Sequence, residues 1–131
     1  MPSNEQRCPC NSSFTFGECC GPIHSGEPAP TAEALMRSRF TAFVTGNTQY
    51  LLDTWAPDTR PEKLVLDTDE HGVPLIRFYR LDILDVVQGG PLDEFGIVEF
   101  EAFYKGDAVG SQRERSTFRR VEGRWLYSSA V

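Results

Sequence analysis

All four cysteines of this 131-residue chain lie within its first 20 residues, and the remainder of the chain contains none. Two close pairs, Cys8-Pro9-Cys10 and Cys19-Cys20, are separated by a loop of eight residues. Two tight turns that bring four thiolates together supply the tetrahedral ligand set that structural zinc favours. The first 30 residues show little apolar periodicity, so this segment cannot fold around a core of its own. The spacing therefore favours a zinc site that orders the N-terminal segment.

Spacing alone leaves three other interpretations of the cysteine cluster open. Cys19 and Cys20 could form a strained vicinal disulfide, or Cys8 and Cys10 could act as a redox dithiol. The segment could also be a reduced, flexible tail. His24 follows Cys20 by four residues and is a candidate substitute ligand, although the pattern favours a solvated loop histidine.

Composition and charge limit the classes of protein to which the chain can belong. Hydrophobic residues make up 40% of the chain, enough for one domain with its own core. No apolar run approaches the roughly 20 residues that span a bilayer, and the N-terminus lacks the apolar region of a signal peptide. We therefore expect a cytoplasmic protein without a membrane partner. The net charge of −6 argues against non-specific binding to nucleic acid.

The charges are unevenly distributed along the chain. Residues 51–104 hold 12 acidic and 4 basic side chains, whereas residues 105–131 hold 3 acidic and 6 basic ones. This asymmetry predicts neighbouring strands of opposite charge in one sheet. The alternative is a basic docking face for an anionic partner.

Hydrophobic periodicity predicts helices first and strands afterwards. We expect one helix from an N-cap at Thr31 to a stop at Gly46, and a second helix through Trp55. Alternation predicts that Leu81, Ile83 and Val87 share one face of the first strand. The expected strands cover residues 81–87, 97–104, 113–121 and 124–128, with a two-residue turn at Glu122-Gly123. Helices followed by an antiparallel meander indicate an α+β fold, a curved sheet wrapped around a helix.

The N-terminal pattern resembles a known zinc-binding element. Cys8-Pro9-Cys10-Asn11-Ser12-Ser13, followed by Cys19-Cys20-Gly21, is similar to the SEC-C motif. That motif is also found at the C-terminus of the SecA translocation ATPase. Asn11 stands where the motif usually has glycine, and asparagine tolerates the left-handed backbone conformation. The resemblance implies a tetrathiolate zinc site.

The rest of the chain resembles the YchJ-like family of bacterial proteins. The segments that carry the resemblance are Leu35-Met36-Arg37-Ser38-Arg39-Phe40-Thr41-Ala42-Phe43, Tyr50-Leu51, Thr54-Trp55, Glu114-Arg115-Ser116-Thr117-Phe118 and Gly123-Arg124-Trp125-Leu126-Tyr127. The family implies a SEC-C-type zinc knuckle in residues 1–28. In residues 29–131 it implies an NTF2-like (cystatin-like) cone, with helices packed in a curved antiparallel sheet. The resemblance implies this fold but no particular reaction.

Cones of this kind often carry a pocket at the open end. The residues expected to contribute to it are Arg37, Arg39, Tyr50, Trp55, Glu114, Ser116, Phe118, Trp125 and Tyr127. Arg37 and Arg39 lie two residues apart on a helix and point in different directions, so at most one enters the pocket. A buried arginine needs a carboxylate partner, and Glu114 is the candidate. The two interpretations are an Arg–Glu pair that locks the helix to the sheet and a polar pocket floor that binds a small ligand.

These patterns predict a zinc-binding protein with a structural metal centre and no catalytic residues of its own. Its knuckle and cone would recognise a protein partner or a small ligand. No phosphate-binding loop, nucleophile elbow or His-Glu-x-x-His motif occurs in the chain. One alternative is a small-molecule-binding protein or enzyme that uses the cone, and another is an adaptor linked to the ribosome or to protein translocation. Because NTF2-like domains often dimerise through the sheet, the resemblance also implies a homodimer.

Overall fold

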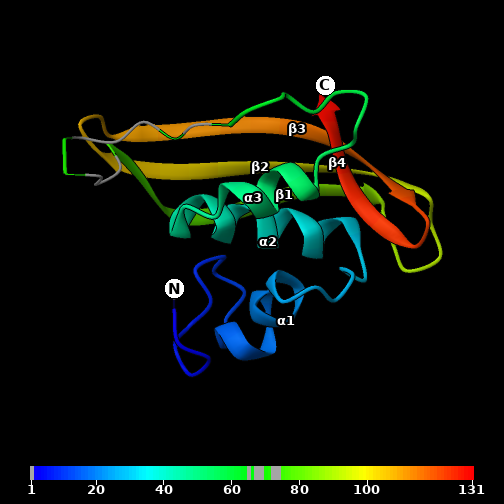
Figure 1. Ribbon diagram of the computed structural model, residues 1–131, viewed down its shortest axis with the longest axis horizontal. Coiled ribbons are helices and arrows are strands. Elements are labelled where there is room, and N and C mark those ends of the chain that lie inside the picture. The colour runs from blue at the N-terminus through cyan, green and yellow to red at the C-terminus, as the bar shows by residue number, and fades with distance from the viewer. Residues whose placement is uncertain (1, 65, 67–69, 72–74) are drawn as a thin grey trace.

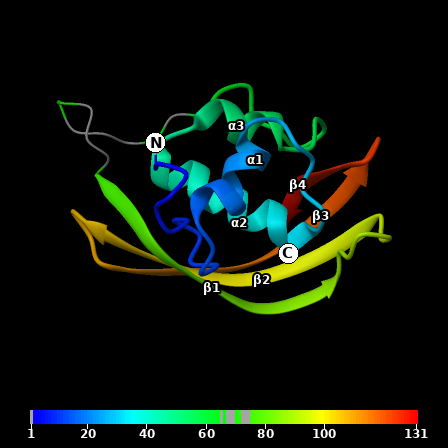
Figure 2. The same ribbon diagram turned by 90° about the horizontal axis from the view of Figure 1, so that it is seen from below.

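The computed structural model describes residues 2–64, 66, 70–71 and 75–131, which form three layers (Figures 1 and 2). One layer is a curved antiparallel sheet with the strand order β1 (Ile76–Gln88), β2 (Phe95–Gly106), β3 (Gly110–Val121) and β4 (Arg124–Ala130). Helix α2 (Ala32–Thr45) lies against its concave face, and helix α3 (Thr48–Asp53) packs against α2. The N-terminal segment, with the 3-10 helix η1 (Phe16–Glu18) and helix α1 (Cys20–His24), covers the other side of α2. The predicted α+β order is confirmed.

Helix α2 begins and ends where the sequence predicts. Thr31 Oγ1 accepts a hydrogen bond from the backbone N–H of Ala34 at 3.0 Å, which satisfies one donor of the first turn. Gly46 ends the helix in the left-handed conformation, with φ at 75°. Residues 38–42 are all buried, so the middle of the helix has no side that faces solvent.

Helix α3 is shorter than predicted. It ends at Asp53, two residues before the expected end at Trp55. The backbone that follows pairs with β4 instead of continuing the helix. Tyr127 N–H donates to the Thr54 carbonyl, and Ala56 N–H donates to the Tyr127 carbonyl, each at 2.8 Å.

Two bulges curve strand β1. The register with β2 shifts after Phe78 and again after Ile83, and each shift inserts one extra residue. After the second bulge, Val87 pairs with Ile97 on the outer face and is 38% exposed. The expectation that Val87 shares the buried face of Leu81 is therefore wrong, because the bulge reverses the alternation.

Strands β2 to β4 follow the predicted alternation. Phe100 and Ala102 of β2 and Phe118 of β3 are buried toward the helices. The turn between β3 and β4 has positive φ at both central residues, 52° at Glu122 and 80° at Gly123. Such a pair defines the type I′ turn that fits the twist of a hairpin. The sequence signal for this turn is confirmed.

The acidic and basic strands pair on the outer face of the sheet. Glu99 of β2 accepts hydrogen bonds from Arg113 at 2.7 Å and from Arg115 at 3.1 Å, both on β3. Arg115 also donates to Asp85 of β1 at 3.0 Å. The charge asymmetry of the sequence therefore corresponds to neighbouring strands, as the first of the two interpretations predicted.

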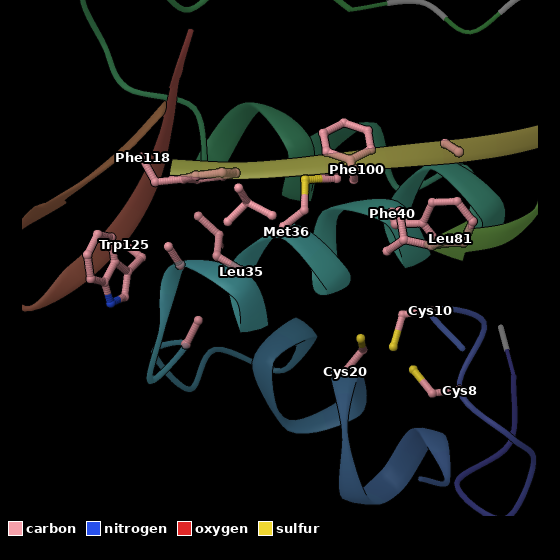
Figure 3. Close-up of a cluster of buried hydrophobic side chains, with 14 of the residues drawn as sticks. Cys8, Cys10, Cys20, Leu35, Met36, Phe40, Leu81, Phe100, Phe118 and Trp125 are labelled. Atoms are coloured by element: carbon pink, nitrogen blue, oxygen red, sulfur yellow. The ribbon is translucent and has the colours of Figure 1, made fainter. Parts of the chain in front are cut away.

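Figure 3 shows that the apolar core continues from the sheet to the cysteines. The labelled side chains are Leu35, Met36 and Phe40 of α2, Leu81, Phe100, Phe118 and Trp125 of the sheet, and Cys8, Cys10 and Cys20. The proposed division into residues 1–28 and 29–131 stays a prediction. Among the helices that the structure describes, none has the length and apolar content needed to cross a bilayer.

Leu35 should be essential for stability, because its side chain lies in this core and is only 2% exposed. We expect Leu35→Ala to lower the free energy of unfolding by about 2–5 kcal/mol through lost burial and the cavity that remains. Leu92→Ala is the matched control, since Leu92 is 95% exposed, and should change stability by less than about 0.5 kcal/mol. Urea unfolding followed by tryptophan fluorescence measures both. Equal losses in the two variants would contradict the packing.

Candidate metal centre and ligand cavity

The four cysteine sulfurs converge where the N-terminal segment meets α2. All four Sγ atoms lie within 4.8 Å of one another. Cys19 Sγ is 3.6 Å from Cys10 Sγ and 3.9 Å from Cys20 Sγ. Cys8, Cys10 and Cys20 are buried and Cys19 is half-buried, and Figure 3 shows the buried three pointing toward one another.

Local backbone turns bring the two cysteine pairs together. Asn11 N–H donates to the Cys8 carbonyl at 3.1 Å, and Asn11 itself has a left-handed φ of 64°. This is the conformation that glycine usually supplies. Cys19 follows η1 directly, and Cys20 begins α1. Gly21 passes so close to η1 that a Cβ there would lie 2.7 Å from the Phe16 carbonyl oxygen.

The distances between the sulfurs fit a tetrahedral metal ion and are too long for a disulfide bond. Zinc–sulfur bonds of about 2.3 Å place the sulfurs of a tetrahedral site about 3.8 Å apart. The distances from Cys19 to Cys10 and Cys20, 3.6 Å and 3.9 Å, lie on either side of that value. A disulfide would need an S–S distance of about 2.05 Å, and all four cysteines are free. The vicinal disulfide between Cys19 and Cys20 is therefore not formed, and the cluster could hold a metal ion.

The thiols affect one another's protonation. Hydrogen bonds with the Cys10 and Cys20 side chains hold the pKa of Cys8 well below its usual range. Burial raises the pKa of Cys19 to about 11. Hydrogen bonds with Cys10 and Cys8, together with burial, raise the pKa of Cys20. Buried sulfurs so close together cannot all carry negative charge without a cation, because like charges repel in a medium of low dielectric constant.

Helix α2 supplies polar contacts to the cysteine cluster. Thr41 is fully buried, and its hydroxyl donates to Cys20 Sγ at 3.4 Å and lies 3.7 Å from Cys8 Sγ. Arg37 Nη1 donates to the Cys10 carbonyl at 2.9 Å. Strand β1 adds one contact, since the Leu81 N–H donates to the Asn11 side chain at 2.6 Å. The cysteine loops are therefore held against both α2 and the sheet.

His24 is not the solvated loop histidine that the sequence suggested. It ends helix α1 and is half-buried, with Nε2 at 2.8 Å from the Ser38 carbonyl of α2. Its ring packs against Tyr50 at a centroid distance of 4.4 Å and against Phe16 at 5.8 Å. The cluster of possible metal ligands contains Cys8, Cys10, Cys19 and Cys20 and does not include His24.

On the opposite side of α2, a cavity of about 540 Å³ lies between the helix and the sheet. Of the nine residues predicted for a pocket, it is lined by Arg39, Trp55, Glu114, Ser116 and Tyr127. The other four lie elsewhere. Arg37 turns toward the cysteine loop, and Phe118 is fully buried in the core. Tyr50 and Trp125 line a separate pocket of about 200 Å³ beside His24.

Arg39 is the buried cation of this cavity, with only 4% of its surface exposed. Its Nη1 donates to the Leu51 carbonyl at 2.8 Å and to the Thr54 hydroxyl at 2.7 Å. Its Cζ lies 5.2 Å from the ring centroid of Trp55 and 4.7 Å from that of Tyr127. Burial lowers the pKa of Arg39 to about 10, so the guanidinium stays charged at neutral pH.

The predicted lock between Arg39 and Glu114 does not form. Both side chains are described in the structure, and no ion pair joins them. Glu114 Oε2 instead accepts hydrogen bonds from the Ser116 hydroxyl at 2.5 Å and the Tyr127 hydroxyl at 3.4 Å. The interpretation failed because Arg39 donates its hydrogen bonds to Leu51 and Thr54 at the end of α3. The Glu114 carboxylate instead accepts from a hydroxyl on its own strand, β3, and from one on β4.

Sequence reasoning missed two hydroxyls at the cysteine cluster. Ser12 Oγ donates to Cys19 Sγ at 3.2 Å, and Thr41 donates to Cys20. The helical spacing could have identified Thr41, because it lies four residues after Arg37 and therefore on the same face of the helix, away from the apolar stripe. Ser12 had no signal beyond its place in the loop.

Comparison with known proteins places the chain among bacterial relatives. A family model described as the middle NTF2-like domain of YchJ matches residues 31–130. A UPF0225 protein of Corynebacterium glutamicum is 62% identical over 125 residues, which cover 95% of each chain. A UPF0225 protein of Streptomyces coelicolor is 49% identical over 122 residues, covering 92% of this chain and 91% of that one.

Two solved structures share the fold. The solution structure of a SEC-C motif containing protein from Rhodopseudomonas palustris has a TM-score of 0.75 and 33% identity, covering 95% of this chain and 96% of that one. The crystal structure of a SEC-C motif containing protein from Psychrobacter arcticus has a TM-score of 0.71 and 24% identity, covering 96% and 82%. The second likeness shows the fold alone.

Thr41→Val should weaken the affinity of the cysteine cluster for a metal ion by about tenfold, because it removes the hydroxyl beside Cys20 and Cys8 while keeping the shape of the side chain. Thr45→Val is the matched control, since Thr45 lies on the same helix and donates to the Thr41 carbonyl of α2 itself. Competition with a chromophoric chelator measures both affinities. An unchanged affinity in Thr41→Val, or an equal loss in both variants, would contradict the assigned contact.

The affinity of the cysteine cluster for a metal ion should fall as the pH falls. A metal ion at this cluster would bind thiolates and would have to displace the protons that Cys19 and Cys20 hold with raised pKa values. We expect the dissociation constant to rise at least about tenfold per pH unit between about pH 8 and about pH 6. The same chelator competition, repeated across this range, tests the slope. An affinity that does not vary with pH would show that the thiols are not the ligands.

Proposed function

The chain belongs to the YchJ-like UPF0225 family of bacterial proteins, and from that premise we propose that it is a zinc-binding protein with a structural metal centre. The observation that carries the proposal is the convergence of four cysteine sulfurs within 4.8 Å of one another. The Rhodopseudomonas palustris relative, which is described as SEC-C motif containing, supports the same assignment. Cys8, Cys10, Cys19 and Cys20 are the proposed ligands.

The proposed role of the zinc is structural because the protein supplies every ligand. A catalytic zinc keeps one position for water or substrate, whereas four thiolates fill a tetrahedral ion. Bound zinc supplies charge neutralisation and cross-linking of the two cysteine loops. Ser12 and Thr41 donate hydrogen bonds to the sulfurs, which helps the thiolates remain ionised.

The proposed consequence of metal binding is to hold α2 in place. Thr41 and Arg37 of this helix contact the cysteine loops on one side, at 3.4 Å and 2.9 Å. Met36, Arg39 and Phe40 of the same helix line the cavity on the other side. The zinc knuckle would therefore fix one wall of the cavity without touching its contents.

The second proposed function is the binding of a small ligand in the NTF2-like cone. Its support is the cavity itself, because about 540 Å³ lies within the range of roughly 300–1,000 Å³ that is typical of ligand pockets. The aromatic walls and the few polar groups also have the usual composition of such sites. Within this proposal, ligand binding and metal binding are separate tasks on opposite sides of α2.

Location and protein partners belong to the same proposal. Four free thiols at such close range are typical of a protein in a reducing compartment, which supports a cytoplasmic location. A protein partner, a homodimer and an adaptor role at the ribosome or in translocation stay predictions.

The freshly purified, reduced protein should carry one zinc ion per chain in native mass spectrometry. The double variant Cys8→Ser, Cys10→Ser should carry none, since two thiolate ligands are lost. A chelator should convert the wild type to the same metal-free form and loosen the N-terminal segment, while the sheet keeps its amide protection in hydrogen exchange.

Two results would contradict the metal assignment. One is a wild-type protein that is folded and reduced but contains no zinc. The other is a serine variant that retains one zinc ion per chain. The control is the variant Ser3→Ala, which changes the same segment outside the cysteine cluster and should keep its metal.

A further inference from the structure

The cavity under α2 combines long apolar walls with one polar cluster. Phe40 and Phe43 of α2 and Phe78 and Phe100 of the sheet form aromatic walls. The polar cluster consists of Arg39, Glu114, Ser116 and Tyr127, which are joined to one another by hydrogen bonds and a cation–π contact. A ligand that fills this space must present an apolar body and a small polar group.

Arg39 determines the charge of that polar group. Nη1 donates both of the hydrogen bonds that Arg39 makes to the described residues. The N–H groups of Nε and Nη2 are therefore available to a ligand. No carboxylate of the described residues lies within ion-pair distance of this buried guanidinium, and Glu114 in the same cavity stabilises its charge only from farther away. A carboxylate offers two oxygens that match the planar fork of arginine. The cavity is therefore complementary to one anionic group.

Glu114 limits the ligand to a single negative charge. Its carboxylate lies in the same cavity wall and is held by the hydroxyls of Ser116 and Tyr127. A second carboxylate on the ligand would be repelled by it, and Asp107, which lines the cavity but is exposed to solvent, adds a weaker, screened repulsion. The two acidic side chains thus disfavour dianions such as dicarboxylates.

We propose that the cavity binds small monocarboxylic acids with an apolar body, whose carboxylate pairs with Arg39 while the body lies against the aromatic walls. This inference rests on the proposed ligand-binding function and adds the chemical class of the ligand. Aromatic acids and medium-chain fatty acids share this chemistry. Competition by one acid of each class distinguishes an aromatic ligand from an aliphatic one.

The test uses N-phenyl-1-naphthylamine, an uncharged dye that fluoresces in apolar pockets, and measures its displacement. The matched competitors are 3-phenylpropionate against 3-phenylpropanamide for the aromatic source and decanoate against decanol for the aliphatic source. We expect at least one acid to displace the dye about tenfold more strongly than its neutral partner. Phenylsuccinate, which adds a second carboxylate, should displace it about tenfold less strongly than 3-phenylpropionate.

Arg39→Met and Arg77→Met remove one arginine each. Arg39→Met should still bind the neutral dye but lose the preference for acid over neutral competitor. Arg77→Met should keep that preference, because Arg77 is exposed on β1 and does not line the cavity. A preference that survives in Arg39→Met, or acids and neutral partners that compete equally in the wild type, would overturn the inference while leaving ligand binding intact. Failure of every compound to bind would overturn the ligand-binding function as well.

A measurement on the wild type keeps the test valid if Arg39→Met does not fold. Trp55 lines the cavity beside Arg39, and its indole nitrogen has no hydrogen-bond partner among the residues that the structure describes. The chain contains two tryptophans, so its amide spectrum holds two indole signals. The bound acid should shift the signal of Trp55, at concentrations about tenfold lower than its neutral partner requires. Equal concentration dependence for acid and neutral partner would overturn the inference.

Discussion

The middle of helix α2 is enclosed on every side, and this enclosure determines how the other elements are arranged. Its run of buried residues, 38–42, is longer than one helical turn of about 3.6 residues, so no single layer can cover it. The sheet covers the side that carries Met36 and Phe40. The N-terminal segment covers the side that carries Ser38 and Thr41. The cone is therefore closed by a segment that has almost no apolar core of its own.

The two sides of α2 bury groups of opposite electrostatic character. The cysteine side gathers sulfurs whose ionisation is limited by mutual repulsion, and it would be completed by a cation. The sheet side buries the guanidinium of Arg39, which is held by a carbonyl, a hydroxyl and two aromatic rings, and it would be completed by an anion. Arg37 and Arg39 face these two environments although only one residue separates them.

The sequence was most informative where a local pattern decides the structure. The cysteine spacing, the cap at Thr31, the stop at Gly46 and the Glu122-Gly123 turn each depend on a few neighbouring residues. The bulge after Ile83 and the hydrogen bond from Tyr127 to Glu114 depend on strand register, which no local pattern encodes. The same limit explains the pocket prediction. Five of its nine residues line the cavity, because which helix face meets the sheet is decided by packing.

The hydrogen bond from Leu81 to Asn11 joins residues 70 positions apart, and this separation has a consequence during synthesis. At about 5–20 residues per second, the cysteine loops leave the ribosome several seconds before β1 is complete. Thr41 and Arg37 emerge earlier, but the sheet that supports their helix comes last. Until β1 emerges, the nascent thiols therefore lack part of the surface on which they dock in the folded protein.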